Sequence, residues 1–110
     1  MNAKTNFMNG LPELLVLRLL SRDEMYGYQL VAEIAARSSE ALRFSEGCIY
    51  PILHRLVARK LLTTRREIVS GRPRHYYRTS AKGLRYVEQL MGEWSKVVTG
   101  AASVLEVRHA

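Results

Sequence analysis

Basic side chains are concentrated in one third of the chain. Residues 54–85 contain ten Lys and Arg residues and one acid, Glu67, so this segment carries a charge of +9, whereas the rest of the 110-residue chain sums to −2. Lys and Arg side chains that contact phosphates release condensed counterions, so such a cluster is typical of proteins that bind a polyanion. A face charged only for solubility would carry more interspersed acids. We therefore expect the segment to bind nucleic acid.

The stretch SEGCIYPILHRL, residues 45–56, predicts a helix with an unusual exposed side. At 3.6 residues per turn its aliphatic residues share one side. The opposite side carries Gly47, Tyr50, Pro51 and His54. Ser45 can cap the helix, and Pro51 costs little if helical bonding begins near residue 47 or 48. Small or flat residues allow the N-terminal half of a helix to enter a DNA major groove, where Tyr50 and His54 can reach bases or phosphates.

A basic hairpin is predicted next. Residues 61–69 are rich in β-branched side chains, residues 70–73 (SGRP) are typical of a turn, and residues 75–79 form a second extended run. This hairpin places Arg72 and Arg74 at its tip, where they can follow the phosphate backbone or enter the minor groove. The alternative is a solvated hairpin after an ordinary helix end. The charge that spans both elements favours binding to DNA.

The order of elements predicts the fold class. Helices are expected from Leu11 to about residue 21, around residues 30–35, and over the quoted stretch, and the basic hairpin follows. Three helices and a two-stranded hairpin make a winged helix-turn-helix, so the chain is mainly α with a small β-hairpin. We expect a flexible N-terminus over residues 1–10, a DNA-binding domain over 11–79 and a dimerisation helix over 80–110, with Thr79 or Ser80 as its cap.

The last helix carries the most regular pattern in the sequence. Apolar residues alternate in spacings of three and four, and a second stripe at residues 90, 97 and 104 widens the face. The predicted dimer interface consists of Leu84, Val87, Met91, Trp94, Val98, Ala101 and Leu105. Packing onto the first helix of the same chain would cover part of this face. Its length favours pairing with a second copy of the chain.

Trp94, the only tryptophan, lies within this seam. Two indoles that meet near a two-fold axis would hold the helices apart and leave an apolar slot. Met91 would form one wall, and Met8 or a neighbour, Phe7 or Leu11, would close the slot. A planar aromatic effector would fit there by offset stacking. The alternative is that Trp94 is ordinary interface core.

Five stretches in the same order resemble the PadR-like transcriptional regulators. They are residues 14–17 (LLVL), 26–30 (YGYQL), 45–56, 71–77 (GRPRHYY) and 79–83 (TSAKG). The resemblance implies a homodimeric repressor that binds double-stranded DNA and dimerises through its C-terminal helix. In some members of the family, binding of an effector releases the DNA. The residues expected to contact DNA are Tyr26, Ser45, Gly47, Tyr50, Pro51, His54, Arg55, Arg72, Arg74 and His75. Cys48 departs from the pattern, because the family usually has Thr or Ser there.

Other classes of function receive little support from the sequence. The lone Cys48 excludes an intrachain disulfide and fits a reducing cytoplasm, and it is either a small packing residue or a redox-sensitive thiol. The three histidines have no metal-ligand spacing with it, so we expect no metal and no cofactor. No catalytic arrangement or membrane-spanning run is present, so an enzyme is not expected. The alternatives are a winged-helix adaptor for protein partners and a double-stranded RNA binder.

Overall fold

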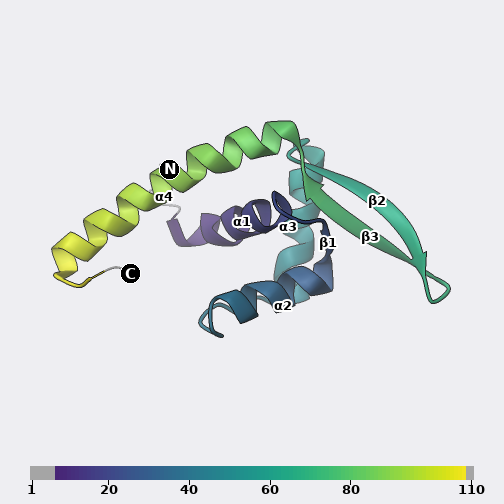
Figure 1. The fold of residues 1–110 in the computed structure, drawn as a ribbon, viewed down its shortest axis with the longest axis horizontal. Coiled ribbons are helices and arrows are strands. Elements are labelled where there is room, and N and C mark those ends of the chain that lie inside the picture. The colour runs from purple at the N-terminus through teal and green to yellow at the C-terminus, as the bar shows by residue number, and fades with distance from the viewer. Residues whose placement is uncertain (1–6, 109–110) are drawn as a thin grey trace.

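The structure is a computed structural model and describes residues 7–108. In chain order this part forms α1 (Phe7–Leu20), β1 (Met25–Tyr26), α2 (Gly27–Arg37), α3 (Glu46–Ala58), β2 (Leu62–Val69), β3 (Arg72–Thr79) and α4 (Ala81–Leu105). Helices α1 to α3 form a compact unit from which the β2–β3 hairpin and α4 extend in opposite directions (Figure 1). This is the predicted winged helix-turn-helix with a long C-terminal helix. Helix α1 begins at Phe7, whereas Leu11 was the predicted start.

The sheet has a strand that the sequence did not predict. β1 pairs antiparallel with β3 and places Tyr26 beside Tyr76, so the strand order is β1-β3-β2. No strand was predicted at Met25 and Tyr26, because two residues are too few to show an alternating pattern. In the wing, the β2–β3 hairpin, both turn residues have positive φ, 52° at Ser70 and 79° at Gly71, as a tight two-residue loop requires.

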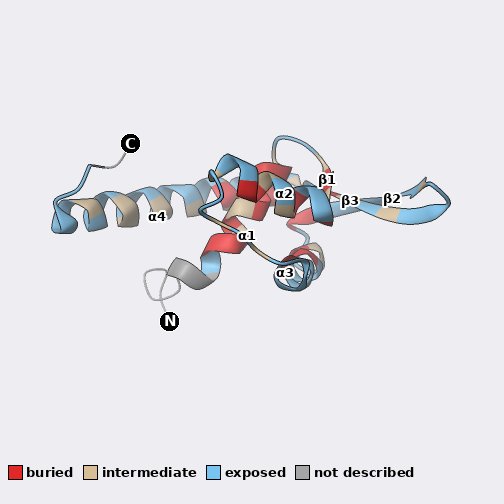
Figure 2. Cartoon of the chain, turned by 90° about the horizontal axis from the view of Figure 1, so that it is seen from below, coloured by how far each residue is buried: buried red, intermediate tan, exposed pale blue. Residues whose placement is uncertain are grey.

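The core lies between α1 and α3 and is closed by β3 and the first turns of α4. Leu17, Leu20, Leu53 and Leu56 are fully buried, and α1 is covered on most of its sides, as its apolar sequence predicted. Figure 2 shows the buried residues gathered in this unit, while most of the hairpin and the far half of α4 are exposed or half-buried. The buried core therefore lies directly behind α3.

The start of α4 is fastened to the end of α3. Ser80, one of the two predicted caps, accepts a hydrogen bond from the Gly83 amide at 3.0 Å, and its hydroxyl donates to the Lys60 carbonyl at 2.8 Å. Lys82 Nζ donates to the Arg59 carbonyl at 3.1 Å. These bonds satisfy groups at two helix ends together, so α3 and α4 meet in a fixed geometry.

The apolar seam of α4 divides into two stripes. Val87 is 1% exposed and belongs to the chain's own core, so its assignment to the dimer interface was wrong: the stripe that contains it packs onto the body of the same chain. Leu90 and Trp94 are partly buried against the same core. The neighbouring stripe faces outward, with Met91 37% and Leu105 68% exposed.

Candidate nucleic-acid interface

The exposed side of α3 carries the residues that the sequence singled out. Gly47, Tyr50, Pro51 and His54 are exposed, and Ser45 caps the helix by accepting a hydrogen bond from the Cys48 amide at 3.1 Å. The helix begins at Glu46, so Pro51 lies further inside it than predicted. Because proline has no N–H, the carbonyl of Gly47 loses its intrahelical donor on the exposed side.

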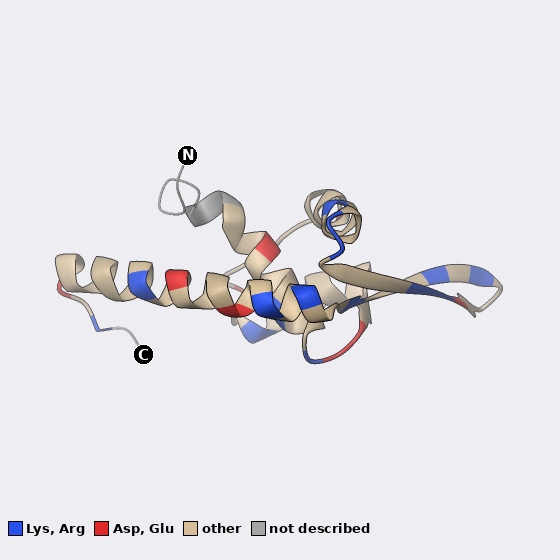
Figure 3. Cartoon of the chain, turned by 90° about the horizontal axis from the view of Figure 1, so that it is seen from above, with Lys and Arg blue, Asp and Glu red and all other residues tan. Residues whose placement is uncertain are grey.

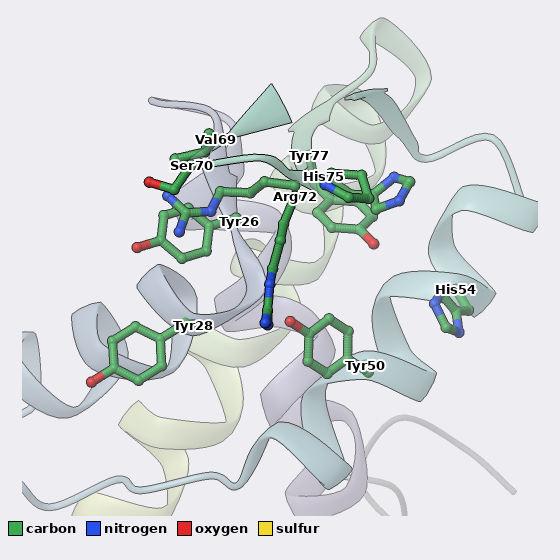
Figure 4. Close-up of a pocket in the computed structure, with 11 residues that line it drawn as sticks. Tyr26, Tyr28, Tyr50, His54, Val69, Ser70, Arg72, His75 and Tyr77 are labelled. Carbon is green, nitrogen blue, oxygen red and sulfur yellow. The ribbon is translucent and has the colours of Figure 1, made fainter. Parts of the chain in front are cut away.

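A cleft of about 520 Å³ lies between α3, the start of α2 and the wing. It brings six of the ten predicted contact residues together from three elements (Figure 4). These six are Tyr26, Tyr50, His54, Arg72, Arg74 and His75. The other four, Ser45, Gly47, Pro51 and Arg55, are exposed at the cap or along α3. Helix α3 and the wing therefore line one continuous surface.

Two tyrosines of this cleft were missed. Tyr28, on the first turn of α2, is 61% exposed, and Figure 4 shows the side chain of Arg72 directed toward the space between Tyr28 and Tyr50. Tyr77 lines the inner wall, where burial raises the pKa of its hydroxyl and the nearby Tyr50 adds to the shift. The sequence offered one signal for Tyr28. It lies on the opposite side of its helix from Leu30, which is buried, so its aromatic ring is exposed.

Stacked side chains hold the wing against β1 and the start of α2. The guanidinium of Arg74 lies over the Tyr26 ring at 4.1 Å, and Tyr26 meets Tyr76 edge to face at 5.7 Å. The guanidinium of Arg65 lies over the Tyr76 ring, with its Cζ 4.5 Å from the ring centroid. Such cation–π contacts limit the freedom of the cations. The base of the wing is thus a packed layer and not a loose ribbon.

Arg65 reaches across β3 to an acid. Its Nε donates to both carboxylate oxygens of Glu24, at 3.0 and 2.9 Å, and its Nη2 also contacts Glu24. The hydrogen bond from Arg65 lowers the pKa of Glu24, and the positive charges of Arg65 and Arg78 act in the same direction. A bidentate pair of this kind uses the donors that would otherwise contact a phosphate.

The basic segment therefore contains two groups of charges. The first group, to which Arg65 belongs, is paired within the protein and includes Arg59. Nη1 of Arg59 lies 3.3 Å from Oε1 of Glu13, and its Cζ lies 5.1 Å from the centroid of the Tyr86 ring. The hydrogen bond with Tyr86 raises the pKa of Arg59. Within residues 7–108, Arg55, Arg66 and Arg72 form no ion pair with an acid. Figure 3 shows basic residues along the wing and over the first turns of α4. The second group, Arg55, Arg66 and Arg72, is therefore available to bind an external anion.

Comparison with known proteins identifies the family. Residues 16–89 match the sequence profile of the transcriptional regulator PadR-like family, and this range includes α3 and the whole wing. The chain belongs to the PadR-like family. A relative in Mycobacterium tuberculosis (strain ATCC 25618 / H37Rv), named transcriptional regulator Rv3488, is 35% identical over 77 residues, which are 70% of this chain and 69% of the relative.

Solved structures of PadR-like proteins share the fold. The PadR family transcriptional regulator from Eggerthella lenta DSM 2243 superimposes with a TM-score of 0.79 at 29% identity, over 94% of this chain and 89% of that one. Bacillus subtilis PadR, solved in complex with operator DNA, has a TM-score of 0.67 at 20% identity, over 72% of this chain and 45% of that one. The second likeness concerns the fold alone.

The remaining chemistry of this PadR-like chain is sparse. Among the residues that the structure describes, no group of three or more His, Cys, Asp or Glu could hold a metal ion. None of the helices in the described range combines the length and the apolar character that crossing a membrane requires. Cys48 is an exposed free thiol on the first turn of α3. The cleft is lined mainly by tyrosine, histidine and arginine side chains.

Proposed function

We propose that this PadR-like regulator is a homodimeric repressor that binds a pseudo-palindromic operator through α3 and the wing. The observation that carries the proposal is the shared cleft, which is lined by Tyr50 and His54 of α3 and by Arg72 and His75 of the wing. Bacillus subtilis PadR, with the same fold, has been solved in complex with operator DNA, which supports DNA as the ligand.

The two sides of the cleft suit different contacts. Helix α3 presents small and flat residues that allow close approach to a major groove, with Tyr50 and His54 in reach of base edges. Arg72 and Arg66 lie on the wing, where a phosphate or a narrow minor groove attracts positive charge. Base contacts would supply sequence discrimination, and wing contacts would supply most of the salt-dependent affinity.

The outward stripe of α4 supports pairing with a second copy. Leu84, Met91, Val98 and Leu105 recur every seven residues, and of these Leu84, Met91 and Leu105 are exposed and Val98 is half-buried. A stripe with this period is the pattern by which two helices pair. A two-fold dimer presents two α3 helices to half-sites one helical turn, about 34 Å, apart or a multiple of it.

Release by an effector forms the second part of the proposal. Trp94 is half-buried against the body and the exposed Met91 lies one turn before it, so a dimer paired through the outward stripe would place the two indoles at the edge of its interface. The side chain of Met8, expected to close the slot, lies outside the described side chains. A planar aromatic molecule that fits one dimer geometry better than another would shift DNA affinity by its differential binding.

A binding screen on genomic fragments, beginning with the region upstream of its own gene, tests the repressor. At physiological salt, the best fragment should bind at least 10³-fold more tightly than random duplex, roughly the lower end of specific recognition. Tyr50→Ala should reduce this ratio, whereas Tyr28→Ala, outside α3, should leave more of it intact. A best fragment no tighter than random duplex would refute sequence-specific binding and favour the protein-adaptor alternative.

A further inference from the structure

Gly27, the first residue of α2, lies directly under the side chain of Tyr50 on α3. Gly27 is buried, and a Cβ atom placed on it would lie 2.7 Å from both Cζ and Oη of Tyr50 and 2.9 Å from Cε1. Non-bonded carbon atoms pack at about 3.5–4.0 Å, so any side chain at residue 27 would overlap the ring. The Tyr50 ring therefore occupies the space that a Cβ would fill.

The backbone itself does not require glycine at this position. Gly27 begins a regular helix after an extended residue, Tyr26, and Gly71 is the one glycine with positive φ within residues 7–108. Alanine is the better helix former, so glycine is unfavourable here for the helix alone. The missing side chain serves the contact with Tyr50.

This contact restricts a residue at the centre of the cleft. Tyr50 remains 36% exposed, and its ring lies against Gly27. The planes of the Tyr50 and His54 rings make an angle of 44°, with the ring centroids 6.4 Å apart. Tyr77 faces it across the cleft from β3 (Figure 4). A tyrosine side chain has two main torsions, and ring contacts on several sides restrict both. A side chain that is already ordered loses less conformational freedom when it binds.

We infer that Gly27 is a positioning residue that sets the direction of the Tyr50 ring and thereby the sequence specificity of operator binding. Gly27 is buried beneath the Tyr50 ring, so it would act on DNA through Tyr50. The inference rests on the proposed function, because the readout is operator binding. The inference also predicts an effect in the protein without DNA. Failure of the inference can therefore be distinguished from failure of the proposed function.

A double-mutant cycle in DNA binding tests the coupling. Gly27→Ala should weaken operator binding about 3- to 10-fold, the range expected when one side chain must be reordered, and leave binding to random duplex unchanged. In a Tyr50→Ala background the same substitution should have no further effect on operator binding. Gly10→Ala, whose added Cβ meets no atom within 4 Å, is the matched control. An equal loss from Gly27→Ala in both backgrounds would overturn the inference.

Fluorine NMR of protein labelled with 3-fluorotyrosine provides the test without DNA. The chain has six tyrosines, and Tyr50→Phe identifies the Tyr50 resonance by its disappearance. Gly27→Ala should shift that resonance more than those of Tyr76 and Tyr86, whereas Gly10→Ala should shift none of them strongly. An unmoved Tyr50 resonance would contradict the contact itself. Absence of operator binding by the unmodified protein would instead refute the proposed function and, with it, the role in specificity.

Thermal unfolding tests the contact between Gly27 and Tyr50 by a change of sign. Gly27→Ala should lower the melting temperature of the unmodified protein, because the ring must move. In the Tyr50→Ala background it should raise the melting temperature, because only the gain in helix propensity remains. If Gly27→Ala alone does not fold, recovery of folded protein in the double variant supports the inference, and failure of both variants overturns it.

Discussion

The guanidinium of Arg74 lies over the ring of Tyr26, with Cζ 4.1 Å from the ring centroid. Arg74 is thus engaged with the body of the protein, whereas Arg72 beside the turn is exposed. The two wing arginines, which the sequence grouped together at the tip, therefore have different surroundings. Arg72 is placed to contact an external phosphate. Arg74 is placed to hold the wing at a fixed angle to the body of the protein.

Arg72→Ala should weaken binding to every duplex and reduce the slope of log K against log salt by about one, because one phosphate contact is lost. Arg74→Ala should in addition lower the free energy of unfolding by about 0.5–1 kcal/mol, the size of an exposed cation–π contact. Salt titrations and thermal melts measure the two effects. Arg37→Ala, which removes an equal charge from an ion pair with Glu33 on α2, is the control. Equal slope changes for Arg72→Ala and Arg37→Ala would remove Arg72 from the interface.

Glu24→Gln should strengthen binding to random duplex and steepen the salt slope by about one, because it releases Arg65 for a phosphate. Glu33→Gln is the matched control, since it breaks the Glu33–Arg37 pair on α2. Titration of random duplex at several salt concentrations measures the affinity and the salt slope of each variant. Unchanged binding by Glu24→Gln would show that Arg65 lies away from the DNA.

The same pair gives a pH dependence of stability. Because Arg65 lowers the pKa of Glu24 in the folded state, the pair stabilises the fold above the ordinary glutamate pKa of 4.5. Its contribution is lost as the pH falls through the lowered, folded-state pKa. The difference in melting temperature between the unmodified protein and Glu24→Gln should therefore be present at neutral pH and disappear in strong acid. A difference that grows on acidification would contradict this assignment.

Local patterns predicted most of the fold. Aliphatic spacing gave the buried sides of α1, α2 and α3, and small hydroxyl residues marked the caps at Ser45 and Ser80, because both signals act between residues close in sequence. Strand β1 was not predictable in this way. Its two residues are defined by their pairing with β3, a contact between distant segments.

The same distinction applies to the candidate site. Residue type and charge singled out Tyr50, His54 and Arg72, which the structure places around one cleft. The pairing of Arg65 with Glu24 joins residues 41 positions apart, so no local pattern indicated which arginines are already engaged. Val87 was misassigned for a related reason: a heptad pattern does not tell which stripe packs within its own subunit.

Val98→Glu should convert the protein to monomer, because it places an unpaired charge in the outward stripe of α4. Operator affinity should fall with it, since a monomer engages one half-site only. Light scattering measures the mass. Gln89→Glu, an exposed position on the opposite side of the helix, adds the same charge and should leave the dimer intact. A dimeric Val98→Glu variant would refute pairing through this stripe.

Planar aromatic compounds should quench Trp94 fluorescence saturably and weaken operator binding by a linked factor. Trp94 is the only tryptophan, so the signal reports on this region alone. Met91→Ala should weaken the quenching, and Gln89→Ala, at an exposed position on the side of α4 opposite the outward stripe, serves as a control. Saturable quenching without a change in DNA affinity would leave a pocket but no switch. An absence of quenching across a broad panel would favour ordinary interface core.

Thr79→Val should lower the free energy of unfolding by about 1–3 kcal/mol, because the Leu17 carbonyl would lose its buried donor. The Thr79 hydroxyl donates to that carbonyl at 2.8 Å and ties β3 to α1. Thr63→Val, which removes an exposed 3.3 Å bond to the Arg78 carbonyl, should change stability by less than about 0.5 kcal/mol. Chemical denaturation measures both values. Equal effects would contradict a special role for Thr79.

The hydrogen bonds from Ser80 and Lys82 to the end of α3 make α4 a lever arm. A helix of 25 residues rises about 37 Å, so tilting it by about 5° about one end displaces the other by about 3 Å. That displacement is close to the rise of one base pair, about 3.4 Å. A ligand at the far part of α4 would therefore need to change the angle between two subunits by only a few degrees to move one α3 out of step with its half-site.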